Sequence, residues 1–393
     1  MSEAVFRLRI SPPPAPPSDY DVVVKPGVLA ELPALLAEVA PAHRYAVVAD
    51  ATVAGLYGER VMSGLVGAGL DAELVMFPAG EQHKTRESWA ALTDALLERR
   101  FGRDGCVVAL GGGVTGDLAA FVAATYMRGI PVVQVPTTLL AMVDASIGGK
   151  TGVDAPAGKN LVGAFHHPRA VIMDPEVLQT LPDVEFRAGL VEAVKHGAIA
   201  DAGYFWGIEE AAERIFSRDP VALTRLVERS VEIKAGVVAE DPYERGARKA
   251  LNFGHTVGHA LETLRGYSLP HGFAVAIGMV AEAEVGEAAG ITEPGTAEAL
   301  RRVLTRLGLP VELPADVPAE AILATARLDK KARQSRIRYT LLARLGAVAR
   351  MPDGDWSMPV EDDVVVAVLA GRAQRGAVEP ERGSGVSPDG ATV

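Results

Sequence analysis

The first half of this chain alternates short apolar runs with amphipathic segments, and this alternation restricts the possible folds more than any other feature. The apolar runs are rich in β-branched residues and indicate strands at 45–48, 72–77, 106–110 and 132–135. Helical spacing occurs at 28–39, 52–68, 86–100 and 116–127. Such alternation predicts an α/β N-terminal domain with a mostly parallel sheet, covered by helices on both faces.

Past residue 180 the strand pattern disappears. Helical spacing follows at 183–200, 219–240, 246–264, 271–290, 295–307 and 317–328, with one strand-like run at 337–342. We therefore predict an α/β domain over 20–180 and an all-helical domain over 181–371, with ligands bound in a cleft between them. We expect residues 1–19 to be a proline-rich lead-in and the polar residues 372–393 to be a disordered tail.

Composition excludes several classes of protein. The net charge of −11 argues against general nucleic-acid binding, which needs a basic surface. The chain lacks the run of about 18 apolar residues that a membrane span needs, and its N-terminus lacks the apolar segment of a secretory signal. Cys106 is the single cysteine, so an internal disulfide is excluded. We expect a cytoplasmic protein without nucleic-acid or membrane partners.

A glycine-rich turn, GGGVTGD at 111–117, lies between a predicted strand and a predicted helix. Glycine lets the backbone approach a phosphate, and a helix N-terminus supplies free N–H groups and partial positive charge. The turn favours a pyrophosphate site, although the GxGxxG dinucleotide motif is absent and a tight turn without a ligand remains the alternative. Asp50, after the first strand, is either a ribose acceptor or a helix cap.

Lysine is scarce, with nine lysines against thirty arginines. Five lysines nevertheless lie in glycine- or histidine-rich stretches or among apolar residues, namely Lys84, Lys150, Lys159, Lys195 and Lys234. Lysine offers a compact charge with a tunable pKa. Two Gly–Lys pairs, at 149–150 and 158–159, place such charges next to glycines, which leave space for a ligand. This distribution favours a small anionic ligand over solvated loops.

Lys234 lies on the apolar stripe of its predicted helix. It is therefore either paired in the interior or extended to the surface along its aliphatic stem. Arg248 and Asn252, at i and i+4, would place a guanidinium and an amide on one face. Arg248 suits a carboxylate ligand because its guanidinium binds carboxylates bidentately.

The helical half carries a constellation with metal-ligand spacing. Glu192 and Lys195 lie one turn apart, His255 and His259 are at i and i+4, and His271 follows twelve residues later. Three of the eight histidines within seventeen residues favour a metal site over ordinary core histidines. Nitrogen and oxygen donors of this kind suit Zn²⁺ with an open position. Spacing alone selects His255 and His259 and cannot decide between His259 and His271.

Taken together, these stretches closely resemble the 3-dehydroquinate synthases of the sugar-phosphate cyclase superfamily. The resemblance runs in order from about residue 20 to 345. It is carried by AGEQHKT (79–85), GGGVTGD (111–117), ATYMRG (124–129), PTTLLAMVDASIGGKTGVDAPAGKNLVGAFH (136–166), TLPDVEFRAGLVEAVKHG (180–197), KAGVVAEDPYERGARKALNFGHTVGHALE (234–262), HGFAVAIGM (271–279) and DKK (329–331).

The resemblance implies a role for each matching residue. Zn²⁺, or alternatively Co²⁺, would be bound by Glu192, His255 and His271, which overrules the choice from spacing and leaves His259 near the substrate. NAD would be bound by Asp50, Glu81, Lys84, Gly112, Gly113, Val114, Thr115, Gly116, Asp117, Thr137, Thr138 and Thr180, with Lys150 and Lys159 nearby. The substrate would meet Asp144, Lys150, Asn160, Lys195, Lys234, Arg248, Asn252, His259 and either Lys330 or Lys331. Arg128 would reach the site of a neighbouring subunit in a homodimer.

The implied activity is a phosphate-eliminating carbon–oxygen lyase of the shikimate pathway, which leads to chorismate and the aromatic amino acids. It converts 3-deoxy-D-arabino-heptulosonate 7-phosphate, a small sugar-acid phosphate, to 3-dehydroquinate. The implied sequence is transient oxidation by NAD⁺, β-elimination of phosphate, reduction and intramolecular aldol closure. Two residues depart from the family pattern: Phe273 stands where Glu is common, and His167 where Gln is usual.

Two other catalytic readings remain. A metal-dependent NAD polyol dehydrogenase would share the architecture, but it does not need the clustered lysines and Arg248. A cyclase for another sugar phosphate, such as sedoheptulose 7-phosphate, would handle a substrate without a carboxylate, which leaves Lys234, Arg248 and Asn252 without a purpose. A non-catalytic binding protein is disfavoured because the metal and cationic candidates are complete.

Overall fold

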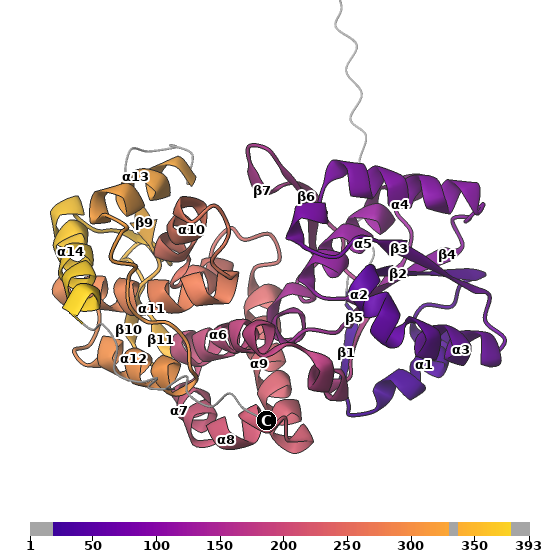
Figure 1. Cartoon of the computed structure of the whole chain (residues 1–393), viewed down its shortest axis with the longest axis horizontal. Coiled ribbons are helices and arrows are strands. Elements are labelled where there is room, and N and C mark those ends of the chain that lie inside the picture. The colour runs from indigo at the N-terminus through magenta and orange to yellow at the C-terminus, as the bar shows by residue number, and fades with distance from the viewer. Residues whose placement is uncertain (1–18, 330–336, 379–393) are drawn as a thin grey trace, which may run out of the picture.

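The N-terminal half is built on one six-stranded parallel sheet. The computed structural model describes residues 19–329 and 337–378. All the pairings within this sheet are parallel, which confirms the predicted architecture (Figure 1). In sheet order the strands are β1 (Asp21–Val24), β8 (Ala170–Met173), β5 (Val132–Pro136), β4 (Gly105–Gly111), β2 (Arg44–Asp50) and β3 (Ala72–Phe77).

Helices cover both faces of the sheet because successive strand residues point to opposite sides. Val47 of β2 packs in the apolar cluster that contains Leu36 and Leu65, whereas Val48 packs in the cluster that contains Leu92 and Leu118. A strand buried on both faces needs an unbroken apolar run, which is why β2 and β4 were recognisable in the sequence. The covering helices are α1 (Leu32–Val39), α2 (Ala51–Val53), α3 (Glu59–Gly67), α4 (Arg86–Glu98) and α5 (Gly113–Thr125).

Four strands of this half were not predicted. β1 and β8 are only four residues long and pair with each other at one side of the sheet. β6 (Lys150–Ala155) and β7 (Gly158–Phe165) form an antiparallel hairpin that carries both Gly–Lys pairs. Gly152 and Gly163 face each other there, and a Cβ on either would overlap the opposite backbone. Glycine, which this close approach requires, has low strand propensity, and this explains why no strand was predicted here.

The C-terminal half is mainly helical. The predicted helix 246–264 is interrupted at Gly254, whose φ of 81° lies outside the helical region. Two short antiparallel pairs lie among the helices, in and after the region of the predicted strand-like run 337–342: β9 (Arg338–Tyr339) with β12 (Met358–Pro359), and β10 (Leu342–Arg344) with β11 (Ala347–Val348). The helices are α6 (Asp183–Ala200), α7 (Ala202–Glu210), α8 (Ala212–Phe216), α9 (Pro220–Glu240), α10 (His255–Leu264), α11 (His271–Ala288), α12 (Thr296–Arg306), α13 (Ala319–Asp329) and α14 (Asp362–Val378).

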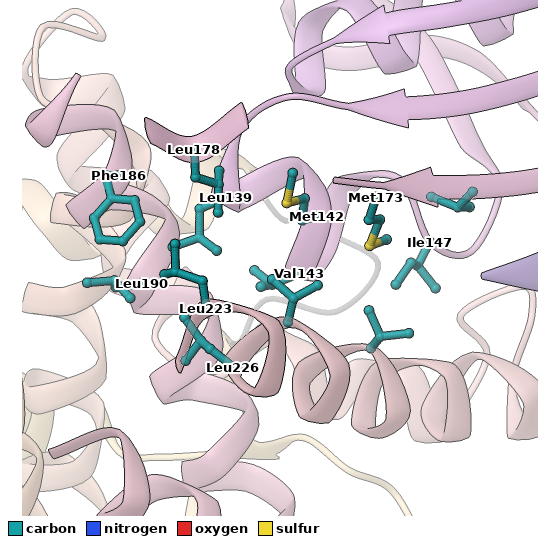
Figure 2. Packing of buried hydrophobic residues seen from close by; sticks show 14 of the residues in the cluster. Leu139, Met142, Val143, Ile147, Met173, Leu178, Phe186, Leu190, Leu223 and Leu226 are labelled. Carbon is teal, nitrogen blue, oxygen red and sulfur yellow. The ribbon is translucent and has the colours of Figure 1, made fainter. Parts of the chain in front are cut away.

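A single apolar cluster joins the two halves. Figure 2 shows Met173 of β8 and Val143 on one side, facing Leu190 of α6 and Leu223 and Leu226 of α9. Val143 belongs to a π-helical turn, Ala141–Ala145, that follows β5. This turn is held between the sheet and the helical half, so its polar residue, Asp144, has a fixed position between them.

Helix α14 extends past residue 372, where the disordered tail was predicted to begin. Arg372 is fully buried, donates to the carbonyl oxygen of Val311 and pairs with Glu284 at 3.2 Å. These contacts tie the helix to the protein, and a polar, glycine-containing sequence does not reveal them. Residues 379–393, like 1–18, lie outside the described residues. In the described part of the chain, no helix is long and apolar enough to cross a membrane.

Glycines bring α6, α10 and α11 into backbone contact. A Cβ on Gly272 of α11 would overlap the carbonyl oxygen of Ala188 in α6, and a Cβ on Gly278 would overlap that of Gly254 before α10. Both glycines are buried. The three helices therefore approach more closely than side chains would allow.

We expect Gly278→Ala to lower the free energy of unfolding by about 1–3 kcal/mol, because the new methyl group forces α10 and α11 apart. Gly236→Ala is the matched control, since Gly236 is also helical and its Cβ would have no neighbour within 4 Å. That control should be neutral or stabilise by about 0.5–1 kcal/mol. Urea denaturation measures both variants, and equal stability of the two would contradict the close contact.

Candidate functional site

Three helices bring a carboxylate and two imidazoles together. Glu192 lies within α6, while His255 and His271 are the first residues of α10 and α11. Glu192 Oε1 is 3.7 Å from His255 Nε2 and 3.8 Å from His271 Nε2. A tetrahedral ion with bonds of about 2.0–2.1 Å spaces its ligands by roughly 3.3 Å. The three donors can therefore bind one divalent metal ion after a small contraction.

Both imidazoles turn Nε2 toward Glu192 because Nδ1 is engaged elsewhere. His255 Nδ1 lies 3.1 Å from the carbonyl oxygen of Phe253, which only accepts, so Nδ1 carries the proton. His271 Nδ1 lies 3.1 Å from Glu262 Oε2. Burial raises the pKa of Glu262, but the hydrogen bond and charge of His271 lower it overall, so the ionised carboxylate accepts. Burial would lower the pKa of His271, but Glu262 and Glu192 raise it overall. With the proton held on Nδ1, loss of the Nε2 proton gives each ring a lone pair directed toward Glu192.

The electrostatics of Glu192 fit a bound cation. Glu192 is completely buried, and its Oε1 accepts no hydrogen bond from the described residues, while Oε2 pairs with Lys195. Burial, Lys195 and the neighbouring histidines lower the pKa of His255 well below its usual value, so this ring is neutral. A buried oxygen without a donor is costly, and a metal ion would satisfy it. One carboxylate and two imidazoles are a donor set that suits Zn²⁺ and leaves a position open.

In two other groups the potential ligand atoms lie close enough together to bind a metal ion. One is His259 with Glu262 and His271, and the other is Asp144 with Glu192 and His196. In the first, Glu262 already bonds His271 Nδ1 and lies 3.6 Å from Lys159. In the second, Asp144 pairs with Lys234. Glu262 and Asp144 are thus neutralised by cations or by a histidine N–H, whereas Glu192 Oε1 has no such partner among the described residues. The Glu192–His255–His271 group is therefore the best metal centre among the described residues.

Asp144 and Lys234 form a buried ion pair beside this centre. Lys234 is 4 % exposed, and its Nζ donates to both the carboxylate and the carbonyl oxygen of Asp144. Burial would raise the pKa of Asp144, but Lys234 and Lys195 hold it well below its usual range. Burial, which outweighs the attraction of Asp144, lowers the pKa of Lys234. Of the two readings of Lys234, internal pairing is therefore correct.

Arg248 is 2 % exposed and is held by backbone carbonyls: its Nη1 lies 3.2 Å from Gly148 O and 2.9 Å from Pro242 O. A Cβ on Gly148, whose φ is 99°, would overlap the guanidinium. The glycine of this motif therefore makes room for Arg248. A second cation, Lys150, pairs with Glu244.

Asn252 joins this group because its Nδ2 donates to Glu244 Oε1 at 3.3 Å. Glu244 was not predicted, and because it lies in an irregular loop no spacing pattern could have identified it. Glu262 was also missed, although it lies seven residues after His255 on the same helix face.

The cofactor candidates form a second group next to the hairpin β6–β7. Lys84 Nζ donates to Asp117 Oδ2 at 2.5 Å and to Asn160 Oδ1 at 2.6 Å. Burial lowers the pKa of Lys84, but Asp117 and Glu81 raise it overall, so Lys84 is charged. Lys159 of β7 lies 3.6 Å from both Glu81 and Glu262, and so connects this group to the metal centre.

Neighbouring side chains fill part of the space beside the glycine turn. A Cβ on Gly111 would overlap Thr115, and a Cβ on Gly112 would lie 2.9 Å from Thr138 Cγ2. No side chain caps α5, so its first amides keep the free N–H groups that geometry leaves there. Asp50 caps α2, because its Oδ1 accepts from Thr52 N at 2.9 Å and from Val53 N at 3.1 Å, while its Oδ2 accepts from Thr115 Oγ1 at 3.2 Å.

The remaining cofactor and substrate candidates differ in their exposure and in their hydrogen-bond partners. Thr137 Oγ1 is buried without a hydrogen-bond partner among the described residues, whereas the Thr180 hydroxyl contacts Tyr57 and Val177. Arg128 is exposed with a φ of 71° and makes no hydrogen bond or ion pair to the residues described. Lys330 and Lys331 lie outside the described residues. Of the two departures, Phe273 packs against the main apolar cluster and His167 lies against Gly149.

His196 is a further buried residue that the sequence did not single out. Tyr204 OH donates to Leu226 O at 2.7 Å, so it accepts from Ser230 Oγ at 3.0 Å. Ser230 Oγ in turn accepts from His196 Nδ1 at 3.2 Å. Burial lowers the pKa of His196 to about 3, and its Nε2 has no hydrogen-bond partner among the described residues. His196 is therefore a neutral acceptor beside Asp144 and Glu192.

Comparison with known proteins gives consistent matches over most of the chain. The profile described as 3-dehydroquinate synthase N-terminal matches residues 74–188, and that of 3-dehydroquinate synthase C-terminal matches residues 189–332. The 3-dehydroquinate synthase of Symbiobacterium thermophilum is 48 % identical over 85 % of this chain and 94 % of its own length.

Solved structures of two cyclases are also similar. The 2-epi-5-epi-valiolone synthase of Streptomyces hygroscopicus subsp. jinggangensis, with NAD⁺ and Zn²⁺ bound, is 30 % identical with a TM-score of 0.82, covering 95 % of this chain and 99 % of that one. A 2-deoxy-scyllo-inosose synthase complexed with carbaglucose-6-phosphate, NAD⁺ and Co²⁺ is 25 % identical with a TM-score of 0.81, covering 89 % and 96 %.

We expect Lys234→Met to destabilise the metal-free protein in a pH-dependent way. In the intact pair, the lowered pKa of Asp144 contributes stability above its unfolded value, and this stability is lost as pH falls. Without the ammonium the pKa of Asp144 rises, so the variant's deficit grows with pH, reaching about 3 kcal/mol near pH 7.

Urea denaturation near pH 4 and near pH 7 measures this deficit. Lys249→Met is the matched control, because Lys249 forms a partly exposed pair with Asp355 at 3.0 Å. The control should cost less than about 1 kcal/mol. A deficit for Lys234→Met that does not change with pH would contradict the coupling.

Proposed function

The chain belongs to the 3-dehydroquinate synthase family, and on that premise we propose how its residues convert 3-deoxy-D-arabino-heptulosonate 7-phosphate to 3-dehydroquinate and phosphate. The observation that carries the proposal is the Glu192–His255–His271 centre, with its buried carboxylate, beside three buried cations, Lys195, Lys234 and Arg248. A metal site alone also suits a dehydrogenase. Lys195 and Lys234 already pair with Glu192 and Asp144, whereas the guanidinium of Arg248 bonds only backbone carbonyls among the described residues. A buried guanidinium held in this way suits a substrate that carries a carboxylate.

Glu192, His255 and His271 would bind Zn²⁺, and Co²⁺ could take its place. The first turn of α5, with Gly112, Gly113, Val114, Thr115, Gly116 and Asp117, would bind the pyrophosphate of NAD⁺. The other NAD⁺ contacts would be Asp50, Glu81, Lys84, Lys150, Lys159, Thr137, Thr138 and Thr180. When bound, NAD⁺ supplies a reversible hydride acceptor and Zn²⁺ a Lewis acid at an alcohol oxygen.

The substrate would lie between the two halves of the chain. The guanidinium of Arg248 is held by the carbonyl oxygens of Gly148 and Pro242. Its remaining N–H groups would bind the substrate carboxylate, with Asn252 beside it. Lys150 and Asn160 come from the hairpin, and Lys195 and Lys234 from the helical half. Their charges would balance the phosphate and carboxylate.

His259 would hold or move a proton at a substrate hydroxyl, since its ring centroid is 5.2 Å from that of His255 and 5.8 Å from that of His271. Asp144 keeps Lys234 in place through their ion pair.

The active unit would be a cytoplasmic homodimer. Arg128 is exposed, and its positive φ holds it in a conformation that non-glycine residues rarely adopt. This supports a role across a subunit interface, where it would reach the partner's substrate. Either Lys330 or Lys331 would complete the site. Cys106, buried as a free thiol, is compatible with a reducing compartment.

The activity is tested by incubating the protein with Zn²⁺, the heptulosonate phosphate and NAD⁺ at a concentration well below that of the substrate. We expect phosphate release to exceed the NAD⁺ present many times over, without net NADH, because the hydride is returned in each turnover. Phosphate and absorbance at 340 nm are followed together. Accumulating NADH without phosphate would instead identify a dehydrogenase.

The likeness to the valiolone synthase makes a second cyclase substrate worth testing. Sedoheptulose 7-phosphate, which lacks the carboxylate, is therefore assayed in parallel. We expect the sugar acid to be strongly preferred, with Arg248→Ala reducing that preference by raising KM for the sugar acid. Faster turnover of sedoheptulose 7-phosphate would overturn the substrate assignment.

The interface role of Arg128 predicts complementation between inactive subunits. Arg128→Ala lacks the group donated to the partner, and His271→Ala lacks a metal ligand of its own site. After the two are mixed and allowed to re-associate, a mixed dimer has one intact site, so about a quarter of the wild-type activity should return. Each variant alone is the control. No recovery in dimers shown to be mixed would place Arg128 in its own subunit's site or remove it from the reaction.

A further inference from the structure

Glu282 is a fully buried carboxylate of α11 that the proposed reaction does not use. Its Oε2 accepts the N–H of Gly254 at 2.8 Å, and its Oε1 accepts the N–H of Val257 at 3.0 Å. Both N–H groups belong to the start of α10, where helix geometry leaves amides without intrahelical acceptors. A neighbouring helix thus supplies the cap that stabilises this end.

Helix α10 has no cap of its own. The residue before it is Gly254, which has no side chain and a φ of 81°. The usual local cap, a Ser, Thr, Asp or Asn at this position, is excluded because a Cβ there would lie 2.9 Å from Met279 N. The close contact of α10 with α11 therefore removes the local cap, and the carboxylate of α11 replaces it.

The capped amide is part of the peptide group that orients a metal ligand. Phe253 C=O and Gly254 N–H belong to the same planar unit, in which the two groups point in opposite directions. Glu282 holds the N–H end, and the C=O end receives the Nδ1 proton of His255 at 3.1 Å. The hydrogen bonds therefore run from the Glu282 carboxylate through the peptide group to the His255 imidazole. The Nε2 atom of this ring faces Glu192.

We propose that Glu282 is a positioning residue for His255, acting through the Phe253–Gly254 peptide group; this rests on the metal centre of the proposed function. A buried anion at the N–H end polarises the peptide and strengthens the hydrogen bond at its carbonyl end. It also fixes the ring and its tautomer before metal arrives. His271 receives the same support directly from Glu262. Each histidine ligand is thus supported by a carboxylate. Glu262 contacts His271 directly, and Glu282 acts on His255 through a peptide group.

Glu282→Gln tests this with nearly unchanged volume. The amide keeps one acceptor oxygen, but its NH₂ group must face either the N–H of Gly254 or that of Val257. Zinc affinity is measured on metal-free protein by competition with a chromophoric chelator, and stability of the same metal-free protein by urea denaturation. We expect zinc affinity to fall about tenfold or more, with a changed visible spectrum of the Co²⁺ form.

Glu284→Gln is the matched control on the same helix, because Glu284 pairs with Arg301 at 2.7 Å and with Arg372 at 3.2 Å, both outside α10. Both variants lose a carboxylate of α11, but only Glu282→Gln should lose zinc affinity. If both bind zinc as the wild type does, the positioning role is wrong. If the wild type itself binds no zinc, the metal centre of the proposed function fails instead.

A measurement on the wild type covers the case in which Glu282→Gln does not fold. Hydrogen exchange of the Gly254 and Val257 amides is compared in metal-free and zinc-loaded protein. If Glu282 organises this turn, both amides are already protected without metal. Fast exchange that becomes slow only when zinc binds would show that the metal orders the turn, and would overturn the proposal.

Discussion

The metal centre depends on the backbone contact of α6, α10 and α11. Each helix contributes one ligand, and the donor atoms meet only because Gly272 and Gly278 let the helices approach without intervening side chains. The same contact buries Glu192 completely. A carboxylate so placed needs positive partners. The ammonium of Lys195 supplies one at Oε2, and a metal ion held with the two imidazoles would supply another at Oε1. Packing therefore determines both the position of the ligands and the electrostatic demand for a cation.

Much of this fold follows from local patterns. The buried middle of β2 and the whole of β4 carry no charged residue because both faces are covered, and α6 and α9 have clear periodicity, so these elements were predicted closely. The hairpin β6–β7 was not predicted, because its glycines satisfy a contact with the facing strand that no local pattern records. The end of α14 was missed for a related reason: Arg372 is held by residues distant in sequence.

The candidate site was predictable to a similar extent. His255, His271 and Glu192 could be named as donors, but spacing alone favoured His259, since i and i+4 is the only geometric information in the sequence. Tertiary packing places Nε2 of His271 near Glu192. Residues that act on the ligands rather than on a substrate, such as Glu262 and Glu282, resemble ordinary helical glutamates. Their function depends on which helix faces them, and that is known only from the fold.

The two histidine ligands are oriented by different groups, and the group that orients His271 links the metal centre to the α/β half. His255 is oriented by a backbone carbonyl and, behind it, by Glu282 within the helical half. His271 is oriented by Glu262, whose other oxygen lies 3.6 Å from Lys159 of the hairpin, and Lys159 is equally close to Glu81 of the α/β half. One ligand therefore depends only on helix packing, whereas the other is electrostatically linked to the cofactor side. The ion-pair distances from Lys159 thus join the hairpin to the carboxylate that orients His271.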